Sequence, residues 1–335
     1  SSAASDVYKR QSLKSVVNQE SAMIDEIKQL ESVARLLEPD LGQREHLLQQ
    51  VSAYSQEYLE GISDAPANYA FADGRGLTDS PIAEQGIEIE EALALLQENV
   101  DTSGITTTSG RFLGYIPGGA LYPSALGDYL AAVANRYAGH FFASPGAVRM
   151  ENMLLRWMAG VAGYSDKAAG NLTSGGSIAN LLAVVTARDT CDIAGDRLPR
   201  SVIYLTEHAH HSIDKAIHVA GLSACIKRKM PVDEQSRMDA GALSKAVAAD
   251  RMAGLNPWLV VAAAGTTNTG SVDPLPAIAE IAEANGLWFH VDGAYGAFFT
   301  LCPEGKAALV GMDKADSLAM DPHKTLFLPY GTGAL

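Results

Sequence analysis

Two short apolar runs end in ionisable side chains whose types and spacing could do chemistry. The run that begins at Leu287 ends at Asp292, and the run that begins at Ser317 ends at His323 and Lys324. Ligands of open α/β sheets bind where the strands end. A lysine amine can form a Schiff base with an aldehyde, and a carboxylate can keep a pyridine nitrogen protonated so that the ring accepts electrons. The pair therefore predicts a site for pyridoxal 5'-phosphate (PLP), although a His-Lys dipeptide alone more often marks a solvated turn.

A loop of small residues upstream is typical of an anion site. Thr173-Ser-Gly-Gly-Ser177 leads directly into apolar residues at helical spacing. Free backbone N–H groups at the start of a helix, together with the helix dipole, favour a phosphate. An ordinary N-cap at Ser177 is the alternative. No Lys-Ser/Thr follows and Gly-x-Gly-x-x-Gly is absent, so neither a Walker loop nor a dinucleotide site is indicated.

Other polar segments also stand at expected strand ends. The His-Glu-x-x-His pattern of zinc sites is absent from Glu207-His-Ala-His-His-Ser212. We therefore expect no metal site there and expect His210 to stack flat on an aromatic cofactor ring; metal ligation by these histidines stays the alternative. Hydroxyls in Gly265-Thr-Thr-Asn-Thr-Gly270 could bind a phenolate oxygen, or they could simply cap a turn. Gly293 and Ala294, beside Asp292, are small enough for a flat ring to lie against the backbone.

Composition is that of an ordinary globular α/β enzyme. The 335 residues are 47% hydrophobic and 19% charged, with a net charge of −14. An acidic balance disfavours nucleic acid and anionic membranes as partners, because both select a basic face. No apolar run approaches the length of a membrane span. The three cysteines are far apart, so neither a disulfide framework nor a zinc site is expected. We expect a cytoplasmic protein.

The pattern of elements predicts an α/β fold with a mostly parallel sheet and helices on both faces. A helical N-terminal segment is expected over residues 12–110, with a break at Pro39-Asp40, and a PLP-binding large domain over residues 111–335. Strands are expected at 202–206, 259–264, 287–291 and 318–320. Helices are expected between them at 177–188, 212–219, 275–285 and 306–311.

Both ends of the chain read as unusual. Asp6-Val-Tyr-Lys-Arg-Gln11 can be read as a translated sequencing adapter, so residues 1–11 are expected to be an artefact or a disordered tail. Gly331-Thr-Gly-Ala-Leu335 begins another expected strand at which the sequence stops. We therefore expect a fragment that exposes apolar surface, is poorly soluble and is inactive until downstream sequence is added.

The ordered motifs resemble one enzyme family. Thr-Ser-Gly-Gly-Ser, Ala-His-His-Ser-Ile-Asp-Lys-Ala, Gly-Thr-Thr, His-Val-Asp-Gly-Ala-Tyr and Asp-Pro-His-Lys are similar to those of the group II PLP-dependent amino-acid decarboxylases. Aromatic-L-amino-acid decarboxylase and glutamate decarboxylase belong to that family. Gly114-Tyr-Ile-Pro-Gly-Gly and Phe142-Ala-Ser-Pro-Gly resemble its substrate-side and dimer-side segments. The resemblance runs from about Leu41 to Leu335 and implies the type I PLP-dependent transferase fold, an obligate homodimer with active sites at its interface.

The resemblance also implies a role for each matching residue. Lys324, His210 and Asp292 would be catalytic, with Lys324 bearing the cofactor and Asp292 pairing its ring nitrogen. The other residues expected at the cofactor are Gly176 and Ser177 at the phosphate, His323 on the phosphate side, Thr267 near the 3'-oxygen and Ala294 against the ring. The substrate pocket would comprise Tyr115, Pro117, Tyr137 and Phe141, the last two reaching across the dimer interface.

The implied activity is decarboxylation of an L-amino acid to the amine and CO2, with an aromatic substrate slightly favoured over an acidic one. The alternatives are another PLP-dependent carbon–carbon lyase, an aldehyde-forming decarboxylase, or a non-catalytic fragment. Two positions depart from the family pattern. Asp321 stands where many members have asparagine, and it is left without a role; Ile116 stands where the aromatic decarboxylases tend to carry an aromatic residue. The family's mobile catalytic loop and small C-terminal domain would lie beyond Leu335.

Overall fold

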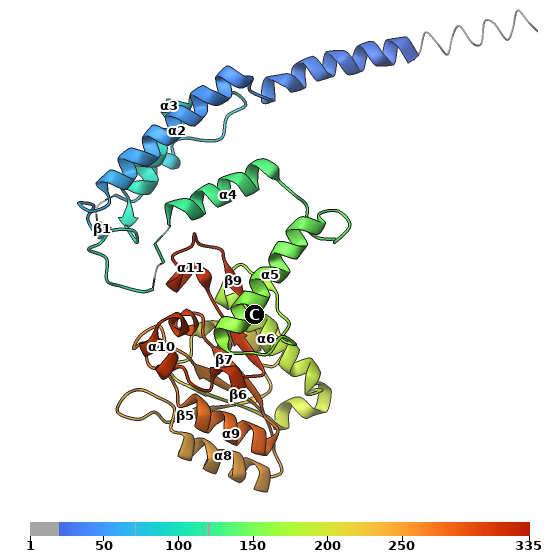
Figure 1. Cartoon of the computed structure of the whole chain (residues 1–335), viewed down its shortest axis with the longest axis vertical. Helices are drawn as coiled ribbons and strands as arrows, with labels where there is room; N and C mark the ends of the chain where they lie inside the picture. The colour runs from blue at the N-terminus through green and yellow to red at the C-terminus, as the bar shows by residue number, and fades with distance from the viewer. Residues whose placement is uncertain (1–19, 71, 117, 120) are drawn as a thin grey trace, which may run out of the picture. The chain divides into compact units, whose positions relative to one another are not determined.

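The computed structural model describes residues 20–70, 72–116, 118–119 and 121–335. The expected tail at 1–11 and the predicted pocket residue Pro117 lie outside the described residues. The described chain falls into two compact units, one ending at Phe112 and the other running from Leu113 to Leu335 (Figure 1).

The first unit is mainly helical, as the apolar spacing predicts. Residues 20–34 are helical, and the chain breaks at Pro39-Asp40 before α2 begins. Asp40 caps α2 by accepting a hydrogen bond from the backbone of Gln43, whose side chain accepts one from Asp40 in return. The elements are η1 (Arg35–Leu37), α2 (Leu41–Gly61), β1 (Asn68–Tyr69), η2 (Arg75–Leu77), α3 (Ile89–Leu96), the π-helical η3 (Gln97–Asp101) and β2 (Gly104–Ile105), with β1 and β2 antiparallel.

The second unit is built on a five-stranded sheet in which every neighbouring pair is parallel. The strand order is β5-β4-β6-β7-β8. The strands are β4 (Ser201–Thr206), β5 (Ile226–Met230), β6 (Asn256–Ala263), β7 (Trp288–Asp292) and β8 (Ser317–Ala319). The predicted parallel sheet and its four expected strands are confirmed.

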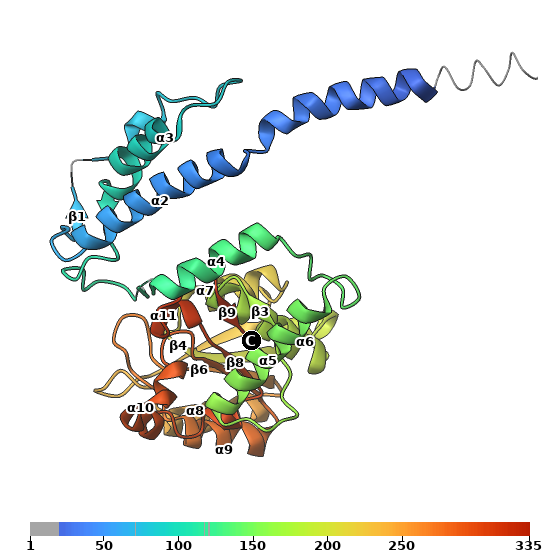
Figure 2. The same cartoon turned by 45° about the horizontal axis from the view of Figure 1, so that its top comes forward.

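Helices cover both faces of this sheet because its buried strands present apolar side chains alternately to each face. On β4, Tyr204 joins one core and Leu205 the other. Both views show α8 and α9 side by side along one side of the sheet (Figures 1 and 2). The first core is completed by α5 (Pro145–Ala162), α8 (Ala240–Met252) and α9 (Leu275–Asn285), and the second by α6 (Gly176–Thr190) and α7 (His211–Val219).

Several elements differ from the expected pattern. The edge strand β5 was not anticipated, because Lys227, Arg228 and Lys229 interrupt its apolar sequence. The helix expected at 306–311 is α10 (Pro303–Ala308), which starts earlier because Pro303 suits a first helical turn. The remaining elements are α4 (Tyr122–Ala134), β3 (Leu172–Thr173), η4 (Gly195–Arg200), η5 (Ala297–Leu301), η6 (Met312–Lys314), α11 (Pro322–Thr325) and β9 (Gly333–Ala334), which pairs antiparallel with β3.

The turn after β7 leaves no room for a side chain at Gly296. A Cβ on this residue would overlap the carbonyl oxygen of Ala264 and lie 2.9 Å from its carbon. A Cβ on Gly160, in α5, would meet no atom within 4 Å. We expect Gly296→Ala to lower the free energy of unfolding by about 1–3 kcal/mol. The control Gly160→Ala should leave it unchanged or raise it by up to about 1 kcal/mol. Urea unfolding followed by circular dichroism measures both, and equal effects would contradict the packing described.

Candidate active site

The strand register brings the predicted catalytic residues to one edge of the sheet. Asp292 ends β7 and pairs in register with Ala263 of β6 and Ala319 of β8. The chain leaves β8 and turns at once into α11, which carries His323 and Lys324. Because the three strands are parallel, their carboxyl ends meet at this edge. Residues far apart in sequence thus become neighbours.

A cavity of ≈340 Å³ lies at this edge. Every residue predicted as catalytic or cofactor-binding lines it: Gly176, Ser177, His210, Thr267, Asp292, Ala294, His323 and Lys324. Its wall also contains residues to which the sequence analysis gave no individual role, among them Asn180, Thr266, Tyr295 and Asp321. The structure therefore gathers the predicted set around one space, while the role of each residue stays a prediction.

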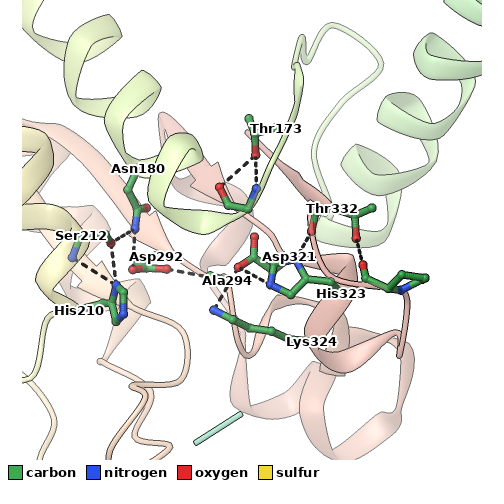
Figure 3. Close-up of polar contacts among 12 residues, drawn as sticks. Thr173, Asn180, His210, Ser212, Asp292, Ala294, Asp321, His323, Lys324 and Thr332 are labelled. Carbon is green, nitrogen blue, oxygen red and sulfur yellow. Dashed lines mark hydrogen bonds and ion pairs between the residues drawn. The ribbon is translucent and has the colours of Figure 1, made fainter. Parts of the chain in front are cut away.

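Lys324 is held by an acidic neighbour that the sequence analysis left without a role. Its Nζ lies 3.0 Å from Oδ2 of Asp321, whose side chain is 2% exposed (Figure 3). The Nδ1 atom of His323 donates to the carbonyl oxygen of Thr332, which ties α11 to the segment before β9. The other oxygen of Asp321, Oδ1, is buried and has no hydrogen-bond partner among the described residues. A carboxylate buried this deeply is stable only when it is paired, and Lys324 supplies the opposite charge.

Asp292 is fixed by hydrogen bonds to both of its oxygens. Its Oδ2 accepts from Nδ2 of Asn180 at 2.9 Å, and its Oδ1 accepts from the backbone N–H of Ala294 at 3.2 Å (Figure 3). Asn180 was missed by the sequence analysis. The available signal was its position one turn beyond Gly176, which places both residues on the same face of α6. A polar residue on that buried face needs partners, and Asp292 is one of them.

His210 stands at the N-cap of α7 and faces the cavity. Its Nδ1 accepts a hydrogen bond from the backbone N–H of Ser212 at 3.3 Å. Burial, followed by the neighbouring His211, lowers the pKa of His210 below its ordinary value. The ring is therefore uncharged at neutral pH, a state suited to flat stacking on an aromatic ring. No group of three or more His, Cys, Asp or Glu side chains that could hold a metal ion occurs among the residues that the structure describes.

The start of α6 forms a cradle without side chains. Gly175 has φ of +136°, in the region that favours glycine. A Cβ on Gly176 would lie 2.8 Å from Oδ2 of Asp321 and 2.9 Å from Cβ of Ala294. The first amides of a helix have no intrahelical acceptor, and the dipole favours an anion there. With the exposed Ser177 beside them, these positions can accept a phosphate group.

Two further cavity residues come from the turn after β6 and from the turn after β7. Thr266 is buried, and its hydroxyl is hydrogen-bonded to that of Thr269 at 2.6 Å. The next residue, Thr267, is exposed and lines the cavity, so its hydroxyl can reach a bound molecule. Ala294 is buried at 6% exposure and offers a small, flat surface. The hydroxyl and the methyl group thus line the same cavity as the carboxylate of Asp292.

The predicted substrate-pocket residues lie elsewhere on the second unit. Tyr115, Tyr137 and Phe141 are 78%, 66% and 52% exposed, and none of them lines the cavity. Pro117 is not among the described residues. Gly118 packs directly on the carbonyl group of His323 and therefore lies beside the turn that carries Lys324.

Comparison with known proteins decides the family. Residues 77–335 match the family described as the pyridoxal-dependent decarboxylase conserved domain. The chain belongs to this pyridoxal-dependent decarboxylase family. It is 36% identical over 259 residues to the aromatic-L-amino-acid decarboxylase of Bacillus atrophaeus, covering 77% of this chain and 53% of that protein. It is 31% identical over 226 residues to the phenylacetaldehyde synthase of Arabidopsis thaliana, covering 64% of this chain and 46% of that protein.

A solved member of the pyridoxal-dependent decarboxylase family has the same architecture. The structure of Oryza sativa TDC with PLP and tryptamine superposes with a TM-score of 0.81 at 25% identity, covering 89% of this chain and 67% of that one. The resemblance stated from the motifs and the type I fold are thereby confirmed. The chain spans about half the length of the curated relatives described above.

The buried pair of Asp321 and Lys324 can be tested without a cofactor. Lys324→Met leaves a buried carboxylate without its cation and should lower the free energy of unfolding by about 1–3 kcal/mol. Adding Asp321→Asn to Lys324→Met should recover much of that loss, because the unpaired carboxylate charge at residue 321 is then removed. The exposed Lys314→Met is the control and should have little effect. Denaturant titrations of the wild type, Lys324→Met, Asp321→Asn, the double variant and the control measure the coupling. Strictly additive effects would show that the two side chains do not form a pair.

Proposed function

We propose that this protein catalyses PLP-dependent decarboxylation of an L-amino acid to the corresponding amine and CO2. The observation that carries the proposal is the convergence of Lys324, Asp292 and the glycine cradle at the start of α6 on one cavity. An amine, a carboxylate and a phosphate-sized anion site are the three recognition elements that PLP needs. Membership of the pyridoxal-dependent decarboxylase family supports the same conclusion.

The residues present fit the cofactor. Lys324 would hold its aldehyde carbon, and Gly176 and Ser177 would hold its phosphate with help from His323. His210 would stack on one ring face while Ala294 lies against the other. Thr267 would lie near the 3'-oxygen. When bound, PLP accepts the electron pair that the substrate's carboxylate leaves behind when it departs as CO2.

Asp292 has the central task in this proposal. Its carboxylate would keep the proton on the pyridine nitrogen, and that positive charge strengthens the ring as an electron acceptor. Asn180 and the backbone of Ala294 hold the carboxylate, so no reorientation is needed during the reaction. The buried walls from β6, among them Val261 and Ala262, exclude water from the inner side of the cavity and strengthen the electrostatic interaction.

We propose that the substrate is an aromatic amino acid, a class that is slightly favoured over the acidic amino acids. The similarity to the Bacillus atrophaeus decarboxylase supports this choice. An aldehyde-forming reaction is the second candidate, favoured by the similarity to the Arabidopsis thaliana phenylacetaldehyde synthase. Another carbon–carbon lyase would use nearly the same cofactor residues. A non-catalytic role is disfavoured, because a protein without activity would have no need to retain Lys324, Asp292 and His210 together. Product analysis separates the first two, since one yields an amine and the other an aldehyde.

We also propose a cytoplasmic homodimer in which Tyr115 and Pro117 line the substrate pocket, while Tyr137 and Phe141 reach it across the dimer interface. The exposure of Tyr115, Tyr137 and Phe141 supports this assignment, because large apolar side chains on the surface are typical of protein interfaces. The net charge of −14 argues against nucleic acid and anionic membranes as partners. Among the described residues, none of the helices combines the length and the apolar character needed to span a bilayer.

Lys324 is expected to be the site of covalent cofactor attachment. Protein reconstituted with PLP should develop a visible absorption band, and borohydride reduction should leave the cofactor mass on the peptide that contains Lys324. The band should be absent from Lys324→Met and unchanged in Lys314→Met, whose lysine is exposed and does not line the cavity. Peptide mass spectrometry makes the assignment. A modified lysine at another position would refute it.

Asp292 is expected to govern turnover more than cofactor binding. Asp292→Asn should retain PLP but slow decarboxylation roughly 10²-fold or more, because an amide cannot hold the pyridine nitrogen protonated. Asp292→Glu keeps the charge and should be milder. Steady-state release of CO2, measured in an active form of the protein that contains this chain, gives the comparison. Wild-type turnover by Asp292→Asn would remove this carboxylate from the mechanism.

A further inference from the structure

A network of buried hydrogen bonds connects two groups that line the cavity from different elements. Nδ2 of Asn180 donates both to Oδ2 of Asp292 and to Oγ of Ser212, each at 2.9 Å. Oγ of Ser212 in turn lies 2.8 Å from Nδ1 of His210 (Figure 3). Asn180 and Ser212 are 1% and 2% exposed, so water does not compete for these bonds. One amide thus joins the carboxylate on β7 to the imidazole that caps α7.

The same amide is anchored from behind by a second histidine. Nε2 of His290 lies 3.0 Å from Oδ1 of Asn180, and Nδ1 of His290 lies 2.9 Å from Oγ of Ser317. The indole N–H of Trp288 donates to the same hydroxyl at 2.9 Å. His290 is 1% exposed and does not line the cavity. Its role in the proposed reaction can therefore be only indirect, through Asn180.

Counting donors and acceptors assigns every hydrogen on the anchoring side. An amide oxygen can only accept, so Nε2 of His290 must carry a hydrogen. Burial lowers the pKa of His290 and keeps its ring neutral, so Nδ1 carries no hydrogen. The carbonyl oxygen of Ser317 lies 3.2 Å from Nδ1 and therefore accepts no hydrogen bond from it; the hydroxyl of the same residue, at 2.9 Å, is the partner of Nδ1. The hydroxyl of Ser317 therefore donates to Nδ1 and accepts from Trp288. The amide of Asn180 cannot be reversed, because its oxygen would then face the carboxylate of Asp292.

The same count fixes the tautomer of His210. The amide nitrogen of Asn180 uses its two hydrogens on Asp292 and Ser212. The backbone N–H of Ser212 donates to Nδ1 of His210, so Nδ1 carries no hydrogen and the hydroxyl of Ser212 donates to it as well. That nitrogen must be an acceptor, so the hydrogen of the neutral ring lies on Nε2.

We propose that Asn180 and His290 are positioning residues that act as one unit, holding the carboxylate of Asp292 in place and selecting the Nε2-protonated tautomer of His210. The part that concerns catalysis rests on the proposed function; the part that concerns the tautomer does not. In a buried network each bond orients the next. Breaking one bond at Asn180 should therefore disturb both the carboxylate and the imidazole.

The first test measures turnover in variants of matched size. Asn180→Leu and His290→Leu should each lower kcat about tenfold to a hundredfold with a smaller change in KM. Each substitution leaves a buried polar group without its hydrogen-bond partner. The double variant should be no worse than the more impaired single variant, as expected for one unit. His290→Gln supplies an amide N–H to Asn180 and should restore most of kcat. Tyr204→Phe, which removes a buried hydrogen bond to Asp250 on the same sheet, controls for general loss of packing and should leave kcat unchanged. Additive losses without rescue by glutamine would overturn the proposal.

The second test needs no cofactor and no activity. The ¹⁵N NMR shifts of His290 and His210 in the wild-type chain should report neutral rings protonated on Nε2. In Asn180→Leu the signal of His210 should move toward a mixture of tautomers, whereas Tyr204→Phe should leave it in place. A wild-type ring protonated on Nδ1 at either histidine would overturn the proposal even if every variant failed to fold. The expected shifts together with a lack of PLP on Lys324 would instead overturn the proposed function and leave the network supported.

Discussion

The parallel direction of the five strands is the constraint on which the site depends. Because all of them run the same way, their carboxyl ends meet at one edge, and whatever follows each strand is delivered there. Asp292 ends β7, Thr267 follows β6, His210 follows β4 and Lys324 follows β8. In an antiparallel arrangement of the same segments, the side chains that follow alternate strands would lie at the opposite edge of the sheet. They would then be missing from the cavity.

Helix α6 is the second determinant, because one face of it serves the cavity in two ways. Its glycine start leaves backbone amides open to an anion, where a Cβ on Gly176 would strike Asp321 and Ala294. One turn later, Asn180 ties the helix to Asp292 and to Ser212. The helix therefore links the anion cradle to the carboxylate and the imidazole. The polar groups buried in this linkage remain stable because each has a partner.

Sequence reasoning worked best where local pattern and tertiary environment agree. Buried strands such as β4 and β6 are nearly continuous apolar runs, so their positions and the parallel sheet could be predicted. The edge strand β5 escaped because its exposed Lys227, Arg228 and Lys229 carry no apolar signal. Asp321 was left without a role because an acid is unfavourable near a phosphate. In the folded protein its neighbour Lys324 lies 3.0 Å away, so the acid forms part of an ion pair.

The sequence by itself determined which reactive side chains are present and the order of the strands and helices that carry them. A lysine, a carboxylate, an imidazole and a glycine-rich loop each followed or preceded a recognisable strand or helix, and local periodicity is enough to place them. The tertiary structure alone decided which buried polar side chains pair with one another. The contacts of Asn180 with Asp292 and His290 join residues more than a hundred positions apart, and no local pattern encodes them. Their geometry comes from the packing of α6 against the sheet, a long-range interaction that exists only in the folded chain.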